Sequence, residues 1–283
     1  MDRKAIVACL SLVAASCGGR DAIVVGSKNF TEQVLLGEIL ARHIERSLGV
    51  PVVRKLDLGG TMLAHEAVVK GSLDLYPEYT GTALTEVLKR PIAREPQAVL
   101  DAVRDAYQRQ WKLTWLPPFG FNNTFAMIVR RDAGVSTLSA AAQAQAWRLG
   151  MGYEFQQRPD GLDGLVKTYR LRLSGQPVTM DLGLLYSALQ NRKVDLIAAN
   201  STDGLISTLP VSALDDDRHY FPPYECAVVV REATLARYPN LRGALEQLSG
   251  KISDSAMRRL NYEVDGKHRP AAEVAAEFLR GLQ

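Results

Sequence analysis

Segments with strand-like and helix-like patterns alternate along most of this chain of 283 residues. The apolar run 22–25 is followed by segment 31–48, in which large apolar residues recur at helical spacing. The strand-like segment 50–58 and the helical segment 62–70 repeat this order. Because two parallel strands need a long crossover, usually a helix, such alternation predicts an α/β fold with a mostly parallel sheet covered on both faces.

Two diproline pairs interrupt this alternation, Pro117-Pro118 and Pro222-Pro223. Each proline lacks an amide donor and fixes its own φ, so such pairs mark boundaries between elements. We interpret them as the two places where the chain passes between lobes. Lobe 1 would contain residues 22–118 and 224–283, and lobe 2, inserted into it, residues 119–223. Ligands tend to bind between domains and beyond the carboxyl ends of strands, so a site is expected between the lobes.

The first residues have the layout of a secretory signal peptide, predicted here for residues 1–16. A basic start precedes an apolar run, 5–13, that is too short for a permanent membrane helix. Small residues then lead to Cys17, which resembles the lipid-attachment site of bacterial lipoproteins. Such sites usually carry Leu where Ala14 stands, so cleavage before Cys17 without acylation is the alternative. Either route places the protein in the periplasm or otherwise outside the cytoplasm.

Composition and motifs argue against several functions. The formal net charge is only +3 and the basic residues are scattered, which disfavours nucleic-acid binding. The four histidines are isolated and no cysteine pair accompanies them, so we predict no metal site. The chain has neither a G-x-S-x-G nucleophile elbow nor a glycine-rich phosphate loop. We therefore predict that the protein is not an enzyme and uses no cofactor.

Aromatic side chains and amides gather at turns and at both diproline crossings. Tyr79 follows Pro77, whose missing amide donor argues against an ordinary central strand, and Tyr224 follows the second crossing. Aromatic faces enclose cations that cannot donate hydrogen bonds, such as quaternary ammonium groups. We therefore predict a site for a cation of this kind. The alternative for each tyrosine is half-buried packing with a solvated hydroxyl.

Six stretches together closely resemble one family, the substrate-binding proteins of osmoprotectant uptake transporters of the ABC class, which handle glycine betaine, choline, carnitine and related compounds. They are VGSKNFTEQVLLGEIL, DLYPEYTGTAL, FNNTFAM, RPDGLDGLVKTY, VDLIAANSTDGLI and FPPYECAVVVR, in the family's order and over essentially the whole mature chain. The resemblance implies a two-lobed periplasmic-binding-protein fold of type II, in which helices flank mixed sheets. It also implies lobes that close on a ligand and dock on an ABC permease in the membrane, and we expect a monomer.

The resemblance places Tyr79, within PEYTGT, and Tyr224, within PPY, in the family's aromatic cage. Two positions depart from the family. Phe125 stands where Tyr is frequent, and Asn200 stands where an aromatic residue is frequent. Because Asn200 supplies no ring, a second class of ligand is an alternative: ergothioneine or another larger betaine-like or polar solute. A sensory solute-binding module is the other alternative.

The stretch GSKNFTEQ, residues 26–33, lies where a predicted strand ends and a predicted helix begins. Because a helix N-terminus favours anions, its polar side chains could hold a carboxylate or another polar end of the ligand. Lys28 has an alternative role, pairing with an acid across the cleft. The predicted ligand-binding residues are Lys28, Asn29, Gln33, Thr61, Tyr79, Asn123, Thr124, Phe125, Asn200, Thr202 and Tyr224.

Overall fold

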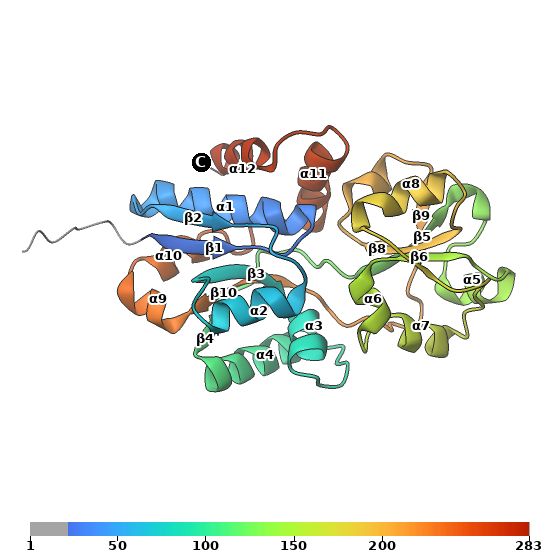
Figure 1. Cartoon of the computed structure of the whole chain (residues 1–283), viewed down its shortest axis with the longest axis horizontal. Helices are drawn as coiled ribbons and strands as arrows, with labels where there is room; N and C mark the ends of the chain where they lie inside the picture. Colours follow the sequence, from blue (N-terminus) through green and yellow to red (C-terminus); the bar gives the residue numbers. More distant parts are fainter. Residues whose placement is uncertain (1–21, 283) are drawn as a thin grey trace, which may run out of the picture.

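Two five-stranded sheets organise residues 22–282, which are the residues that this computed structural model describes. Each sheet is the centre of one lobe, and the two lobes lie next to each other along the longest axis of the molecule (Figure 1). The signal peptide predicted for residues 1–16 and the acylation predicted at Cys17 lie outside the described residues.

The first lobe contains a mixed sheet with the strand order β2-β1-β3-β10-β4. Its strands are β1 (Ile23–Gly26), β2 (Val52–Lys55), β3 (Leu75–Tyr79), β4 (Leu113–Trp115) and β10 (Cys226–Arg231). Strand β1 pairs in parallel with β2 and β3, whereas β10 is antiparallel to β3 and β4. Strands β2, β1, β3 and β4 therefore run in one direction, and the expected mostly parallel sheet has a single reversed strand, β10, which enters on its return from the other lobe.

The second lobe contains a sheet of the same design, with the order β7-β6-β8-β5-β9. Its strands are β5 (Phe125–Arg130), β6 (Leu149–Met151), β7 (Val178–Thr179), β8 (Leu196–Asn200) and β9 (Val211–Ala213). Strand β6 pairs in parallel with β7 and β8, and β5, which arrives from the first lobe, is antiparallel to β8 and β9. The antiparallel strand of each sheet is thus the one that a crossing segment delivers.

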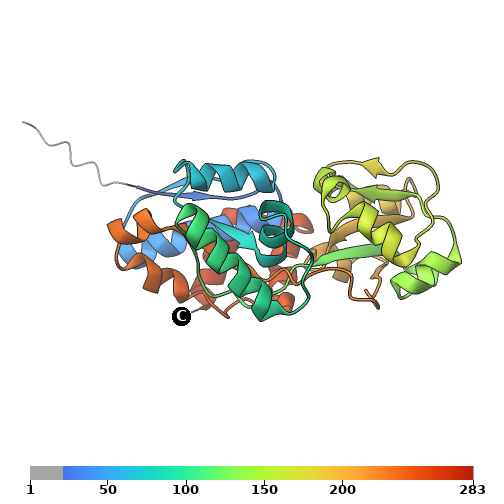
Figure 2. The same cartoon turned by 90° about the horizontal axis from the view of Figure 1, so that it is seen from below.

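Helices cover both faces of each sheet (Figures 1 and 2). Those of the first lobe are α1 (Thr31–Leu48), α2 (Thr61–Val69), α3 (Thr80–Thr82), the π-helix η1 (Ala83–Val87), α4 (Pro96–Trp111), α9 (Glu232–Arg237), α10 (Leu241–Glu246), α11 (Asp254–Asp265) and α12 (Ala271–Gly281). Those of the second lobe are α5 (Leu138–Ala144), α6 (Tyr153–Gln157), α7 (Leu162–Tyr169), α8 (Leu185–Gln190) and the 3₁₀ turns η2 (Arg131–Ala133), η3 (Leu182–Leu184) and η4 (Gly204–Ser207). Within residues 22–282, no helix combines the length and the apolar character that a membrane span requires.

Strand β10 shows how the two faces of the first sheet are buried. Val228 and Val230 pack into the core formed with α1, α10 and α12, whereas Ala227 and Val229 pack into a second core formed with α2 and α4. Neighbouring residues of a strand point to opposite faces, so a strand covered by helices on both sides is apolar at every position. The run CAVVV meets this requirement, and its first residue, Cys226, is a buried free thiol.

Pro77 lies in the middle of β3, which is the central strand of its sheet, so the expectation that Pro77 excludes an ordinary central strand was wrong. Its partner across the ladder is Val228, whose carbonyl accepts a hydrogen bond from Leu116 on the opposite side. On its other edge, β3 pairs with β1 only at Leu75, before the proline is reached. No ladder hydrogen bond requires the donor that proline lacks.

The two segments that cross between the lobes lie side by side. The amide of Asn123 donates to the carbonyl of Tyr224 at 3.1 Å, and the amide of Tyr224 donates to the side-chain oxygen of Asn122 at 2.6 Å. The lobe boundaries expected at residues 118 and 223 lie within these segments and stay predictions. Two short hydrogen-bonded connections form a natural hinge, because a few backbone rotations in them can reorient whole lobes.

Helix α11 reaches across from the first lobe to the second. Arg258 donates to the carbonyl of Ser201 at 2.8 Å, and η4 packs against α11 (Figure 1). At Gly204 a Cβ would lie only 2.3 Å from the backbone nitrogen of Tyr262, so glycine is required for this approach. The hinge is therefore supported by a third contact in addition to the two crossing segments.

Candidate functional site

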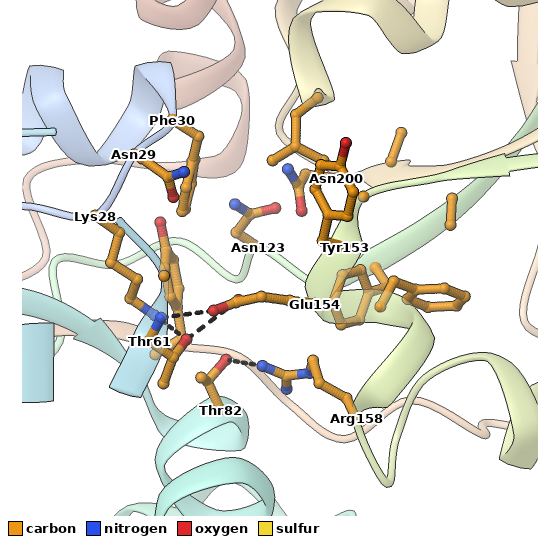
Figure 3. A pocket seen from close by; sticks show the side chains of 18 of the residues that line it. Lys28, Asn29, Phe30, Thr61, Thr82, Asn123, Tyr153, Glu154, Arg158 and Asn200 are labelled. Carbon is orange, nitrogen blue, oxygen red and sulfur yellow. Dashed lines mark hydrogen bonds between the residues drawn. The ribbon is translucent and has the colours of Figure 1, made fainter. Parts of the chain in front are cut away.

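A cavity of about 250 Å³ opens between the two lobes. It lies beyond the ends of β1, β3, β6 and β8, which supply Lys28, Tyr79, Gly152 and Asn200 to its wall. Six aromatic residues, contributed by both lobes and by the crossing segments, line it: Phe30, Tyr79, Phe125, Tyr153, Phe155 and Tyr224. Figure 3 shows Phe30 and Tyr153 on facing sides of the cavity. This is the position at which α/β sheets commonly bind ligands.

The amine of Lys28 is held inside the first lobe. It lies 2.5 Å from a carboxylate oxygen of Glu78 on β3 and 3.2 Å from the hydroxyl of Thr61 on α2. It also lies 5.1 Å from the centre of the Tyr79 ring. The expected alternative, an acid partner across the cleft, was therefore wrong, because the acid that pairs with Lys28 belongs to the same lobe. Lys28 reaches the cavity as half of a buried ion pair.

Glu32, in the first turn of α1, is hydrogen-bonded to four other segments of the molecule. Its carboxylate accepts hydrogen bonds from Tyr79 (2.8 Å), Asn123 (2.8 Å), Thr202 (2.6 Å) and Asn261 (2.9 Å). These donors come from β3, a crossing segment, the second lobe and α11. Burial raises the pKa of Glu32, and the four donated hydrogen bonds act in the opposite direction. Glu32 is therefore a buried acceptor that connects the hinge to the site.

Glu154 extends from α6 across the cleft to the start of α2 (Figure 3). Its carboxylate accepts from the amide of Thr61 at 2.6 Å and from the Thr61 hydroxyl at 3.3 Å. A Cβ at Gly60 would lie 2.2 Å from the same carboxylate, so the approach depends on glycine. A carboxylate at a helix N-terminus is favoured by the free amides and by the helix dipole. Glu154 thus places a negative charge on one wall of the cavity. Among the described residues, no basic side chain lies within ion-pair distance of it, since Lys28 and Arg158 pair with other acids.

Arg158, which directly follows α6, contributes to the same side of the cavity wall together with aromatic rings. Its guanidinium binds Asp160 through two nitrogens, at 2.8 and 2.6 Å, and donates to Thr82 at 3.2 Å. It lies 5.2 Å from the ring centre of Phe125 and 5.8 Å from that of Tyr224. The hydroxyl of Tyr224 donates to Asp160 at 2.5 Å, and burial raises the pKa of this hydroxyl. The charge of Arg158 is neutralised by Asp160, as the charge of Lys28 is neutralised by Glu78.

The structure brings eight of the eleven predicted ligand-binding residues to the cavity wall: Lys28, Asn29, Thr61, Tyr79, Asn123, Phe125, Asn200 and Tyr224. The other three lie behind it. The side chain of Gln33 accepts from the amide of Lys28 at 3.3 Å, Thr202 binds Glu32, and the carbonyl of Thr124 accepts from Ser201 at 2.9 Å. These three residues position the wall, and all eleven binding assignments stay predictions.

Sequence reasoning missed several wall residues, of which Phe30, Thr82, Glu154 and Arg158 have the clearest contacts. Phe30 stacks on Tyr79, with ring centres 6.2 Å apart and planes 22° apart. Phe30, Thr82 and Arg158 stand inside stretches that had been singled out, so their positions were available as a signal. Nothing local to Glu154 indicates that it faces a residue of the other lobe.

Comparison with known proteins connects this cavity to a family. Residues 21–281 match the profile of the family described as the substrate-binding domain of ABC-type glycine betaine transport systems. The chain belongs to this family.

A carnitine transport binding protein of Listeria monocytogenes, OpuCC, is 33% identical over 95% of this chain and 92% of its own length. The ergothioneine transport permease/ergothioneine-binding protein EgtU of Helicobacter pylori is 33% identical over 92% of this chain, which spans only 47% of that longer protein. A solved structure of a glycine betaine/carnitine/choline ABC transporter protein superposes with a TM-score of 0.78 at 31% identity, covering 92% of this chain and 98% of that one.

Membership of this family confirms several expectations. The protein is a non-enzymatic, extracytoplasmic substrate-binding protein of an ABC transporter, which binds a small molecule and interacts with a membrane permease. Its two mixed sheets flanked by helices are those of the type II periplasmic binding proteins. The cavity between the lobes is the place where such a fold can enclose a solute.

Proposed function

We propose that this protein captures a small solute carrying a quaternary ammonium group, of the glycine betaine, choline or carnitine type, and presents it to an ABC permease. The observation that carries the proposal is the set of six aromatic residues around one cavity between the lobes. A methylated ammonium cannot donate hydrogen bonds, so electron-rich ring faces are its best partners, each worth about 0.5–2 kcal/mol as water is excluded.

The charges around the cavity support a cationic head group. Lys28 and Arg158 are the basic residues of the wall, and each is paired with a buried carboxylate. Glu154 and Asp181 add two further carboxylates to the wall. The hydroxyls of Tyr79 and Tyr224 donate to Glu32 and Asp160, which makes the ring faces more negative. Acidic groups thus outnumber basic ones, and a cation gains from this balance.

Within this proposal, Tyr79, Phe125 and Tyr224 form the cage, and Tyr153 supplies the ring that Asn200 does not. Tyr153 lines the cavity from α6 with 64% of its surface exposed, so it has room to swing onto a ligand when the lobes close. The remaining predicted residues, Lys28, Asn29, Thr61, Asn123 and Asn200, contact the polar end of the solute, while Gln33, Thr124 and Thr202 hold the wall.

The proposal also covers the organisation and location of the protein. The lobes are residues 22–118 with 224–283 and residues 119–223, and they close about the paired crossing segments. The protein acts as a monomer that is acylated at Cys17 and so is held at the membrane beside its permease. The crossing segments support the first statement, and the sequence around Cys17 supports the last.

A second candidate ligand is ergothioneine, a betaine with a larger thio-imidazole body. Asn200 places an amide on the wall, and Phe125 provides a ring without a hydroxyl, so the cavity can accept a body that is larger and partly polar. One relative, EgtU, is described as an ergothioneine-binding protein.

A thermal-shift screen tests both ligand classes. Glycine betaine, choline, carnitine, proline betaine and ergothioneine would be added separately to the purified protein. We expect at least one to raise the melting temperature, because a ligand at about 100 times its Kd adds about 2.7 kcal/mol to the free energy of unfolding. Glycine at the same concentration serves as the control, because its ammonium carries no methyl groups and donates hydrogen bonds. Equal melting temperatures in all samples would reject the proposed solute class.

Glu154 should set the choice between cationic and zwitterionic solutes. Replacing Glu154 with Gln removes one negative charge from the wall while keeping the side-chain volume. We expect the affinity for choline to fall more than the affinity for glycine betaine, because the net cation loses an attraction that the zwitterion's carboxylate partly opposes. Titration calorimetry with both ligands measures the ratio. Glu66→Gln, at an exposed position on α2, is the matched control and should leave the ratio unchanged.

A further inference from the structure

A second cavity, of about 480 Å³, adjoins the first one. It lies between α1 and α11 of the first lobe and α8 and the end of β8 of the second. The two cavities share six wall residues: Asn29, Phe30, Asp181, Leu182, Ala199 and Asn200. A single elongated molecule that enters the first cavity can therefore extend into the second.

The second cavity differs from the first in its charge. Five carboxylates line it: Glu32, Asp57, Asp181, Asp203 and Asp265. Among the described residues that form its wall there is no Lys, Arg or His. An anion would be repelled from such a space, and a cation that enters it finds no competing charge.

One buried acceptor on this wall has no donor. Asp203 and Asp265 are half-buried, and each already accepts through one oxygen: Asp203 from Tyr186 and from the amide of Asn200, both at 3.0 Å, and Asp265 from Thr31 at 2.6 Å. The amide oxygen of Asn261, a residue only 2% exposed, is buried and unpaired within the described part of the chain. A buried polar atom without a partner costs about 1–3 kcal/mol, so a ligand that donates hydrogen bonds here would be favoured.

The electrostatics of these carboxylates would favour a cation. Burial raises the pKa of Asp203 to about 7, and the charges of Glu32 and Asp265 act in the same direction. Burial also raises the pKa of Asp265. A bound cation would relieve this repulsion, because opposite charges at close range favour the ionised carboxylates.

The chemistry of the wall limits which kinds of cation can bind in the second cavity. Within residues 22–282, no three or more His, Cys, Asp or Glu side chains are grouped as a metal site requires, so a bare metal ion is a poor fit. A quaternary ammonium cannot use carboxylate and amide acceptors directionally. A primary ammonium, a guanidinium or a protonated imidazole can, through charge-assisted hydrogen bonds.

We propose that the second cavity is a subsite for a hydrogen-bond-donating cationic group at the far end of the solute, so that the protein accepts solutes with two cationic ends. The inference rests on the proposed function, since the quaternary end would occupy the aromatic cavity. Phe30 forms the partition, because it lines both cavities and stacks on Tyr79.

Two probes with the same four-carbon chain test the proposal. Aminobutyl-trimethylammonium carries both cationic groups, and butyl-trimethylammonium lacks only the primary amine. We expect titration calorimetry to give the aminobutyl probe an affinity about tenfold higher or more, as charge-assisted hydrogen bonds to Asp203 and Asp265 would produce. Asp203→Asn and Asp265→Asn keep an acceptor oxygen but remove the charge, and each should lower the ratio of the two affinities. Asp101→Asn, at an exposed position on α4, is the matched control and should keep the ratio.

The outcomes separate this inference from the proposed function. Equal affinities of the two probes would overturn the subsite while leaving the aromatic site in place. Binding of the aminobutyl probe alone would support the subsite and count against the aromatic cage. An absence of binding by both probes would reject both sites, and an affinity ratio unaffected by Asp203→Asn and Asp265→Asn would reject the assignment to these carboxylates.

Discussion

Tyr79→Ala and Tyr224→Ala should each weaken binding of the quaternary ammonium ligand selected by the screen about tenfold or more, which corresponds to about 1.4 kcal/mol. Each substitution removes a ring from the cavity wall, and a desolvated ring face contributes energy of this size to a bound cation. Titration calorimetry on the folded variants gives the dissociation constants directly.

The phenylalanine variants are the matched controls for this prediction. Tyr79→Phe and Tyr224→Phe keep the ring but lose the hydroxyl that donates to Glu32 or Asp160. We expect them to bind more tightly than the alanine variants, and more weakly than the wild type, because the rings lose the influence of the carboxylate. Phe125→Leu removes a third ring without touching a hydrogen bond and should also weaken binding. Wild-type affinity in the folded alanine variants would contradict the assignment of Tyr79 and Tyr224 to an aromatic cage.

Much of the site could be predicted because its residues come from motifs that are continuous in the sequence. Lys28 and Asn29 follow β1 directly, and Tyr79 ends β3, so each lies at a strand end whatever the rest of the chain does. Tyr224 directly follows the second diproline pair, and Asn123 lies shortly after the first, and these pairs mark the crossings. Strand ends and crossings are local features, and the fold gathers them at one place.

The contacts across the cleft could not be predicted in this way. Glu154 binds Thr61, which is 93 positions away, and Glu32 binds Thr202, which is 170 positions away. Such pairs depend on how the lobes are placed relative to each other, and no local pattern encodes that placement. Pro77 gave a misleading signal for a related reason. Whether a strand tolerates proline depends on which edge its missing donor faces, and only the completed sheet decides that.

The same long-range contacts decide which single residue matters most for the stability of the site. Lys28 and Arg158 each have one main acid partner, so losing either leaves one uncompensated charge. Glu32 has four donors from four separate segments. Removing it leaves four buried donors without an acceptor and at the same time disconnects the second lobe and α11 from α1. Removing Glu32 should therefore lower the free energy of unfolding by more than the loss of either ion pair.

Glu32→Ala should lower the free energy of unfolding by about 3 kcal/mol or more, since each unsatisfied buried donor costs about 1–3 kcal/mol and water can satisfy only some of them. Glu32→Gln keeps the volume and one acceptor oxygen but turns its amide toward donors, so we expect roughly half that loss. Urea denaturation monitored by circular dichroism gives both values. Glu66→Ala, which removes an exposed carboxylate paired with Lys70, is the matched control and should leave the free energy of unfolding nearly unchanged. If Glu32→Ala and Glu66→Ala unfolded at the same urea concentration as the wild type, the hydrogen bonds to Glu32 would not stabilise the contact between the lobes.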